Sequence, residues 1–193
     1  MMADRRLAAI MFTDLVGYSA LVQEDEARAL ALLEEHRQLL RGIFPVHDGA
    51  EVKTTGDGFL VEFPSSLRAV ECAIDVQTQL RARNATTAPE RRIRLRIGIH
   101  LGDVEHRDGD VVGDGVNIAA RVEPLADPGG ICVTRAVHDQ VADRVDADLV
   151  SLGERELKHI ARPVEIHSVV LPWQDRPRSS PRAAGGAGHP RRR

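Results

Sequence analysis

Residues 53–63 read KTTGDGFLVEF, in which a Gly-Asp-Gly turn separates two short extended segments. The Asp-Gly pair at residues 57–58 is a strong short-range signal for a β-hairpin. Residues 51–55 supply one arm, and the apolar run at residues 59–63 suits a buried strand. The stretch therefore predicts an antiparallel hairpin whose tip carries the carboxylate of Asp57.

The segments on both sides of this hairpin complete an alternating order of strands and helices. Before it, the apolar run Leu7–Thr13 predicts a strand, and residues 19–44 keep apolar side chains at helical spacing until Pro45. After it, residues 64–80 predict a second helix, and the alternation over Ile93–Leu101 is the clearest strand pattern in the chain. The order βαββαβ predicts an α+β fold with a ferredoxin-like core, an antiparallel sheet with both helices on one face.

The wiring of this core brings distant residues together. In a ferredoxin-like sheet the third strand lies between the first and the second. The hairpin tip with Asp57 should therefore lie beside the end of the first strand, where Asp14 follows the apolar run. Two carboxylates that are far apart in the sequence are expected to converge.

The rest of the chain is expected to form an arm and a tail. After residue 102, a loop rich in Asp and Gly leads to a helix near residues 116–125 and then to short strands and a helix up to Leu171. We assign residues 1–172 to one domain with a C-terminal αβ arm. Residues 173–193 are rich in Pro, Gly and Arg without apolar periodicity, and we expect them to be disordered.

Composition narrows the class of protein. The 193 residues suit a single domain, and the formal charge of -3 includes an Arg-rich C-terminus, so the folded part is more acidic than the whole. An acidic domain argues against a nucleic-acid partner. Cys72 and Cys132 lie in apolar runs and are expected to be buried free thiols. No stretch has the length or character of a membrane span or a secretory signal, which predicts a cytoplasmic location without a membrane partner.

The residues FTDLVGYS at 12–19, with Asp57, form the strongest candidate site. Carboxylates at two adjoining strand ends can hold one or two hard divalent cations together with phosphate oxygens. The backbone N–H groups of Leu15, Val16, Gly17 and Tyr18 can cradle a triphosphate where the strand passes into the helix. The alternative is that Asp14 caps the helix and Asp57 only makes a turn. The topology favours the metal site.

These motifs carry a family resemblance. With GDVVGDGVNIAAR at 109–121, the sequence resembles the catalytic domains of class III adenylate and guanylate cyclases, especially bacterial ones, from residue 7 to about residue 170. The resemblance implies that Asp14 and Asp57 bind two divalent cations, Mg²⁺ or Mn²⁺. One cation would activate the ribose 3′-hydroxyl for in-line attack on the α-phosphorus, and the other would bind the triphosphate and the leaving pyrophosphate.

The resemblance also implies the residues that read the substrate. Lys53 and Asp110 match the family's purine-reading pair, and a Lys donor with an Asp acceptor suits adenine better than guanine. The expected reaction is therefore ATP to 3′,5′-cyclic AMP and pyrophosphate. Asn117 and Arg121 match the transition-state pair and, four residues apart on a helix, share one face. Taken singly, Lys53 and Asp110 are better explained as a solvated strand lysine and a loop aspartate. For Asn117 and Arg121, a surface asparagine and a salt-bridging arginine are as good an explanation as the site role.

One chain is not expected to complete a site. Along an extended strand Lys53 lies about 13 Å from Asp57. This separation fits the family's head-to-tail dimer, in which one subunit gives the metal aspartates and the other gives the purine and transition-state residues. Because the chain carries both sets, a symmetric homodimer with two shared sites is expected. A regulatory domain outside this sequence is a further expected partner.

The chain departs from the family pattern at one position. Many members have a late Lys-Gly-Lys-Gly-like segment whose lysine touches the triphosphate, whereas residues 156–162 read ELKHIAR. Lys158 is the candidate substitute, with Arg162 as the alternative. Two further functions stay open: a guanylate cyclase of the same fold, and an inactive domain that binds nucleotide for regulation. A diguanylate cyclase ranks lower because its hairpin carries Gly-Gly followed by an acidic residue.

Overall fold

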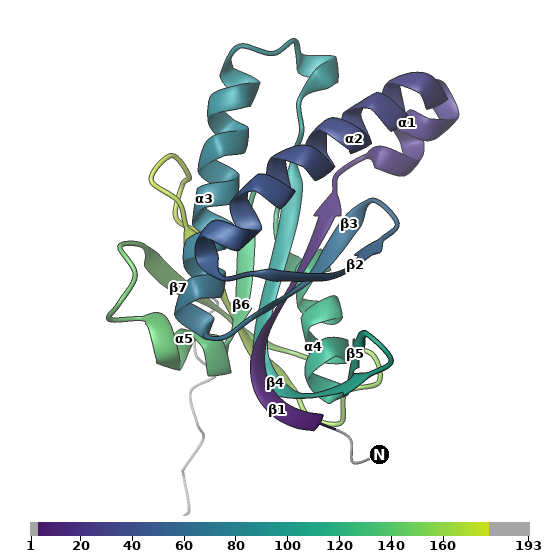
Figure 1. Cartoon of the computed structure of the whole chain (residues 1–193). Helices are drawn as coiled ribbons and strands as arrows, with labels where there is room; N and C mark the ends of the chain where they lie inside the picture. Colours follow the sequence, from purple (N-terminus) through teal and green to yellow (C-terminus); the bar gives the residue numbers. More distant parts are fainter. Residues whose placement is uncertain (1–3, 178–193) are drawn as a thin grey trace, which may run out of the picture.

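The computed structural model describes residues 4–177, which form an 8-stranded sheet with helices on both faces (Figure 1). The strand order is β2-β3-β1-β4-β6-β8-β7, and β5 pairs with β4 outside this order. The strands are β1 (Asp4–Leu15), β2 (Ala50–Thr55), β3 (Gly58–Phe63), β4 (Leu95–Arg107), β5 (Asp110–Val112), β6 (Ile131–Thr134), β7 (Asp148–Arg155) and β8 (Val164–Val170). The helices are α1 (Tyr18–Glu24), α2 (Glu26–Ile43), α3 (Ser66–Ala85), α4 (Asp114–Val122) and α5 (Arg135–Val141), with short 3-10 turns η1 (Phe44–His47), η2 (Pro89–Arg91) and η3 (Glu123–Leu125).

The expected ferredoxin-like core is confirmed by the order of the first four long strands. β3 lies between β2 and β1, and β1 pairs antiparallel with both β3 and β4. The expected C-terminal αβ arm is present and extends the same sheet: β6 pairs parallel with β4, and β8 and β7 follow by antiparallel pairing. The arm therefore lengthens the sheet on the side away from the β2–β3 hairpin.

The two faces of the sheet have different coverings. Alternate residues of β1 point to opposite faces, so Ala9 and Met11 join the large core under α2, α3 and α5, whereas Ala8 and Ile10 join a smaller cluster under α4 and β5. α2 and α3 lie on one side of the sheet and α4 on the other (Figure 1). Asp14, which follows the alternation of Ala8 and Ile10, belongs to the face with α4. This face carries the candidate site.

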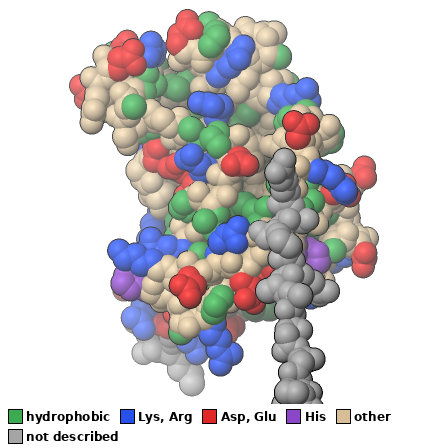
Figure 2. Space-filling view, turned by 180° about the vertical axis from the view of Figure 1, so that it is seen from behind, with side chains coloured by type: hydrophobic (Ala, Val, Ile, Leu, Met, Phe, Trp, Pro, Cys, Tyr) green, Lys and Arg blue, Asp and Glu red, His purple; other side chains and the backbone are tan. Residues whose placement is uncertain are grey.

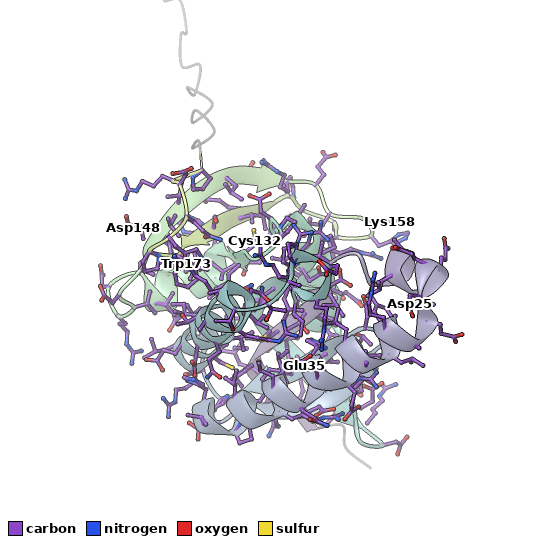
Figure 3. All side chains as sticks on the ribbon, turned by 90° about the horizontal axis from the view of Figure 1, so that it is seen from above. Asp25, Glu35, Cys132, Asp148, Lys158 and Trp173 are labelled. Carbon is purple, nitrogen blue, oxygen red and sulfur yellow. The ribbon has the colours of Figure 1, made fainter. Side chains whose placement is uncertain are left out.

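The expected continuous helix over residues 19–44 is wrong in one respect, because α1 and α2 are separate helices. Asp25 joins them in an extended conformation, with φ −154° and ψ 91°, and its side chain accepts a hydrogen bond from the Arg28 N–H at 2.9 Å. This capping gives α2 its own beginning. Figure 3, which labels Asp25, shows it at the junction of the two helices.

The expected loop after residue 102 is also wrong. β4 continues to Arg107 and turns back through Asp108 and Gly109 into β5, and both turn residues have positive φ, 49° and 81°. An Asp-Gly pair in this left-handed conformation is typical of a tight hairpin. The Asp-Gly signal that predicts the first hairpin is therefore present here too, and the hairpin places Asp110 at the start of β5.

The C-terminal part of the described chain packs onto the domain. Trp173, which is labelled in Figure 3, contacts the large core, with the Arg81 guanidinium 4.6 Å from its ring centroid. The Gln174 side chain donates to the Gly129 carbonyl at 3.1 Å. Most of the expected disordered segment, residues 178–193, lies outside the described residues. Both cysteines are buried and free, as expected. No helix within residues 4–177 is long and apolar enough to cross a membrane.

His36 of α2 gives the fold a pH dependence that can be tested. Its side chain is fully buried beside Phe59, and burial, with the Arg37 charge, lowers the pKa of His36 from 6.5 to about 4. The folded chain therefore binds fewer protons at this position than the unfolded chain, so stability is highest above pH 6.5 and falls as the pH drops toward 4.

We expect this residue to remove about 3 kcal/mol of unfolding free energy over that range. In His36→Leu the decline measured by urea unfolding at several pH values should be shallower, whereas His159→Asn, in an exposed turn, should leave the profile unchanged. A His36→Leu profile as steep as that of the wild type would contradict this role.

Candidate active site

Asp14 and Asp57 are brought together by a close backbone contact between β1 and the β2–β3 hairpin. Thr13 pairs with Phe59, and the Phe59 N–H donates to the Thr13 Oγ1 at 3.0 Å. A Cβ atom at Gly58 would lie 1.7 Å from the Thr13 carbonyl oxygen, so only glycine fits there. The hairpin tip is thus fixed directly beside the end of β1, and the expected convergence of the two carboxylates is observed.

The electrostatics of this pair are those of two like charges held together. The pKa of Asp14 is raised, first by burial and then by the charge and hydrogen bonding of Asp57. Arg96 opposes this rise, with its Nη1 3.7 Å from the Asp14 Oδ2. Repulsion between neighbouring carboxylates is relieved by a proton or by a cation. The pair therefore fits a divalent cation.

The pair does not form a complete metal cage. Among residues 4–177 no group of three or more His, Cys, Asp or Glu side chains is arranged to hold a metal ion. A cation at Asp14 and Asp57 would take its remaining ligands from water and substrate, as Mg²⁺ does when phosphate oxygens complete its coordination. The donor set suits a metal that arrives with a nucleotide.

α2 holds the hairpin that carries Asp57. The Arg37 Nη2 donates to the Gly56 carbonyl at 3.1 Å, and Arg41 forms a two-point ion pair with Glu51, both distances being 2.8 Å. Gly56 itself has φ 71°, in the left-handed region. The position of Asp57 therefore depends on the packing of α2 against the hairpin as well as on the turn.

Fewer backbone N–H groups are free to bind a triphosphate than the sequence predicts for residues 15–18. Leu15 is a buried residue of β1, and the Val16 N–H already donates to the Arg94 carbonyl at 2.9 Å. Gly17 adopts φ 78° before the first turn of α1. The N–H groups of Gly17 and Tyr18 have no acceptor in the part of the chain that the structure describes. The backbone of these two residues is what the turn can offer to a phosphate.

Lys53 and Asp110 form a second group. The Lys53 Nζ donates to both carboxylate oxygens of Asp110, at 2.8 and 2.6 Å, so β2 and β5 are joined through these side chains. The Val111 N–H donates to the Asp110 Oδ1 at 2.8 Å, and these bonds lower the pKa of Asp110. Both side chains are exposed. The result is a preformed donor and acceptor facing solvent.

Asn117 and Arg121 form a third group on α4. The helix buries Gly115, Ala119 and Val122 against the sheet, so Asn117 and Arg121 share the exposed side. Neither side chain has a hydrogen bond or ion pair with any residue between 4 and 177. They are free to contact a ligand, and nothing in the described chain links them to Asp14 or Asp57.

Lys158 lies in the exposed turn between β7 and β8. Figure 3 shows it at the periphery of the molecule. No ion pair or hydrogen bond connects it to another candidate site residue of the described chain. The neighbouring His159 has φ 67°, which makes the turn tight. The structure therefore does not join Lys158 to the Asp14 and Asp57 pair within one chain.

Two charged residues at the site were missed from the sequence. Arg96, read only as a polar position of an alternating strand, lies directly opposite Asp14 in the β1–β4 register. Glu123 follows α4, and burial together with the charges of Asp14 and Asp57 raises the pKa of Glu123 to about 7. The one signal in the sequence for a role of Glu123 was its position two residues after Arg121. The pair of aspartates is therefore part of a cluster of three acids and one arginine.

Comparison with known proteins identifies this arrangement. A family model described as the adenylate and guanylate cyclase catalytic domain matches residues 2–170. The chain belongs to the adenylate and guanylate cyclase catalytic domain family. The resemblance drawn from the three sequence motifs is thereby confirmed, and the fold is that of the solved members.

Individual relatives agree with this assignment. A putative adenylate cyclase 3 of Rhizobium meliloti is 45% identical over 183 residues, covering 93% of this chain and 30% of the relative. The crystal structure of an adenylate/guanylate cyclase/hydrolase from Silicibacter pomeroyi is 39% identical, with a TM-score of 0.82 over 88% of this chain and 99% of that one. The guanylyl cyclase Cya2 has a TM-score of 0.77 at 25% identity, over 89% of this cyclase domain and 95% of that chain.

These likenesses fix the family but not the substrate. The chain spans less than a third of the length of the Rhizobium relative, and the structural relatives include both adenylyl and guanylyl cyclases. The family includes adenylyl and guanylyl cyclases, so a proposal for the substrate rests on this domain's own residues.

The close contact at Gly58 gives a test of the site. Gly58→Ala should push the hairpin away from Thr13, because the new Cβ has no room. We expect a loss of about 2 to 4 kcal/mol in unfolding free energy and loss of cyclase activity. Gly42→Ala is the matched control, since a Cβ at Gly42 in α2 meets nothing within 4 Å and should be neutral or stabilising. Equal effects of the two substitutions on urea unfolding would contradict this account.

Proposed function

We propose that this cyclase domain converts ATP to 3′,5′-cyclic AMP and pyrophosphate at a site shared between two copies of the chain. The observation that supports the proposal is the presence of two separate groups in one domain. Asp14 and Asp57 converge in one group, and Lys53 and Asp110 form an exposed ion pair in the other. The first group suits the phosphates of a nucleotide with its metal. The second suits the edge of a purine.

Asp14 and Asp57 would hold two divalent cations, Mg²⁺ or Mn²⁺. When bound, these ions supply Lewis-acid activation of the ribose 3′-hydroxyl and neutralise charge on the triphosphate and on the leaving pyrophosphate. A cation that offsets the negative charge of Asp57 favours the ionised form of Asp14. Metal binding requires this ionised form. The free N–H groups of Gly17 and Tyr18 belong to the segment that follows Asp14 and can contact phosphate oxygens.

The Lys53–Asp110 pair supports adenine over guanine. Within residues 4–177, Asp110 Oδ2 accepts a hydrogen bond from Lys53 alone, so it can also accept from the exocyclic amino group of adenine. The Lys53 ammonium has three donors and can give one to a ring nitrogen of adenine. Guanine presents a carbonyl and an N–H at the corresponding edge and would leave both side chains wrongly paired. The preformed ion pair therefore favours ATP.

Asn117 and Arg121 would act on the reacting centre. Both project from the exposed side of α4 without partners in the described chain, so no internal contact must be broken for either to reach a ligand. The planar Arg121 guanidinium is suited to the charge that develops on the α-phosphate, and the Asn117 amide can orient the ribose. Preorganised donors of this kind typically account for large factors in rate.

The lack of a direct link between these groups within one chain supports a head-to-tail homodimer. No hydrogen bond or ion pair within residues 4–177 links Asn117, Arg121 or Lys53 to Asp14 or Asp57. All of them lie on the sheet face that carries α4, which leaves this face available to a second copy. Each copy would then give its aspartates to one site and its purine and transition-state residues to the other.

The surface charge agrees with a small anionic substrate. On the face drawn in Figure 2, Lys and Arg side chains are interspersed with Asp and Glu and form no continuous basic strip. A polyanion such as a nucleic acid would be held by such a strip. A nucleotide needs only the local cations of the site.

Complementation tests the reaction and the shared site together. The purified domain with Mn²⁺ or Mg²⁺ should form cyclic AMP from ATP, measured by chromatography of the products. Asp14→Ala and Asn117→Ala should each lose activity by at least about a hundredfold. Mixing the two folded variants should restore activity, because half of the sites in a mixed dimer are then intact. A mixture as inactive as its components, with mixed dimers shown to be present, would rule out the shared site.

Substrate choice tests the base-reading pair. Asp110→Ala should reduce the ratio of kcat/KM for ATP to that for GTP by about tenfold or more, because the acceptor for the adenine amino group is lost. Glu105→Ala, an acidic residue on the adjoining part of β4, serves as the control and should keep the wild-type ratio. A wild-type domain that prefers GTP would favour the guanylate cyclase alternative. Nucleotide binding without product would favour the inactive regulatory domain.

A further inference from the structure

Two side-chain contacts join the β2–β3 hairpin to the β4–β5 hairpin. The first is the exposed ion pair between Lys53 of β2 and Asp110 of β5. The second joins β3 to β4, where the His106 Nε2 lies 2.8 Å from the Glu62 Oε2. Arg6 of β1 lies beside this contact, and its Nε donates to the Glu62 Oε1 at 3.1 Å. We call Arg6, Glu62 and His106 the Glu62 cluster.

The Glu62 cluster is a buried carboxylate with two donors. Arg6 can only donate, and its Nε does so to Glu62. The His106 Nδ1 is buried without a hydrogen-bond partner among residues 4–177, so a hydrogen on that atom would lack an acceptor. The ring hydrogen therefore lies on Nε2 and is donated to Glu62. Because the Glu62 side chain is only 10% exposed, loss of either donor would leave a buried carboxylate underpaired.

The contact between Glu62 and His106 requires the end of β4 to bend over the sheet. Glu62 pairs with Ile10, and Ile10 pairs with His100, so Glu62 and His100 lie at the same level of the sheet. His106 is six residues further along β4 than His100, which is about 20 Å on a flat strand. The two side chains cannot span that distance, so the paired ends of β1 and β4 must bend. Figure 1 shows the beginning of β1 curving out of line with the rest of the strand.

The same bend carries β5 to β2. In the described chain β5 pairs only with β4, and its Val111 lies opposite His106. Asp110 can therefore reach Lys53 only when the end of β4 lies over the sheet. The Lys53–Asp110 ion pair is exposed and is a weak support by itself. The buried Glu62 cluster is the stronger of the two contacts, because breaking it leaves an underpaired charge inside the protein.

We propose that Glu62, held by Arg6 and His106, is a positioning residue for purine recognition. It fixes the β4–β5 hairpin over the sheet and thereby sets the spacing of Lys53 and Asp110 that fits the edge of one purine. The proposal rests on the proposed function for the role of Lys53 and Asp110 in binding the base, whereas the effect of the Glu62 cluster on the spacing of the hairpins does not.

Variants of His106 separate the hydrogen bond from the presence of a side chain. His106→Gln keeps an N–H donor that can reach Glu62, whereas His106→Leu has none. His47→Leu is the matched control, because the His47 Nε2 lies 3.0 Å from the Asp75 Oδ2 in a contact between η1 and α3, away from both hairpin tips. The His47 Nδ1, like that of His106, is buried without a hydrogen-bond partner in the part of the chain that the structure describes.

The spacing of the hairpins is measured first, without nucleotide. Spin labels at the exposed positions of Thr54→Cys and Arg107→Cys give a distance distribution by electron paramagnetic resonance, and the native cysteines are buried. An excess of unlabelled chains removes distances between copies. We expect His106→Leu to widen the distribution about twofold, and His106→Gln and His47→Leu to keep the wild-type width. An unchanged distribution in His106→Leu, or equal widening in His47→Leu, would overturn the proposal.

The affinity for two purines is measured second. 3′-deoxy-ATP and 3′-deoxy-GTP lack the hydroxyl that cyclisation uses, so their Kd values, measured by calorimetry with Mn²⁺, report recognition without turnover. We expect His106→Leu to lower the preference for 3′-deoxy-ATP over 3′-deoxy-GTP about fivefold, because Lys53 and Asp110 are no longer held at the spacing of one base edge. His106→Gln and His47→Leu should keep the wild-type preference. A wild-type preference in His106→Leu would overturn the role in recognition even if the distance distribution widens.

Failure of this proposal and failure of the proposed function give different results. If the wild-type domain makes no cyclic nucleotide, or prefers GTP, the proposed function fails, and the distances and the two Kd values still decide the role of the Glu62 cluster. If the wild-type domain binds neither analogue, both proposals fail. If cyclic AMP is formed and His106→Leu keeps the wild-type preference, only the positioning role fails.

Discussion

The close approach of Gly58 to the Thr13 carbonyl is the constraint on which the rest of the site depends. No residue with a Cβ fits at this point, so the backbones of β1 and the β2–β3 hairpin are in direct contact. That contact sets Asp57 against Asp14 and creates a cluster of like charges that the fold alone does not neutralise. The burial energy of the strands below, and the clamp of Arg37 on the hairpin tip, hold the carboxylates together against their repulsion.

The two faces of the sheet have different roles, because one contains the large core and the other carries the candidate site. One face is covered by α2, α3 and α5 and contains the large core, which can resist local strain on the other face. The other face is only partly covered, by α4 and β5, and every group assigned to catalysis projects from it or from its rim. α4 is short and buries small residues against glycine positions of β4, which lets the helix lie close to the sheet while its polar side remains free.

The charged residues on this face form two groups, one with balanced charge and one with an excess of negative charge. Lys53 and Asp110 satisfy each other and form a ready donor and acceptor, whereas Asp14, Asp57 and Glu123 outnumber Arg96. A satisfied pair can recognise a neutral base edge at little cost, and an unsatisfied acidic cluster binds what brings positive charge. The division fits a ligand with a purine at one end and metal-bound phosphates at the other.

The sequence by itself determined the local elements and the main chemical groups. The Gly-Asp-Gly turn, the alternation over Ile93–Leu101 and the helical spacing gave the βαββαβ order, and the three motifs gave the family. It did not show the break at Asp25 or the second hairpin at Asp108, although both have local signals of capping and turn formation. It also left open what surrounds Asp14, because Arg96, Glu123 and the bonded Val16 N–H reach the site through register. Only the tertiary structure decided these contacts, since a strand's periodicity fixes which face a side chain takes but not which distant residue lies opposite it.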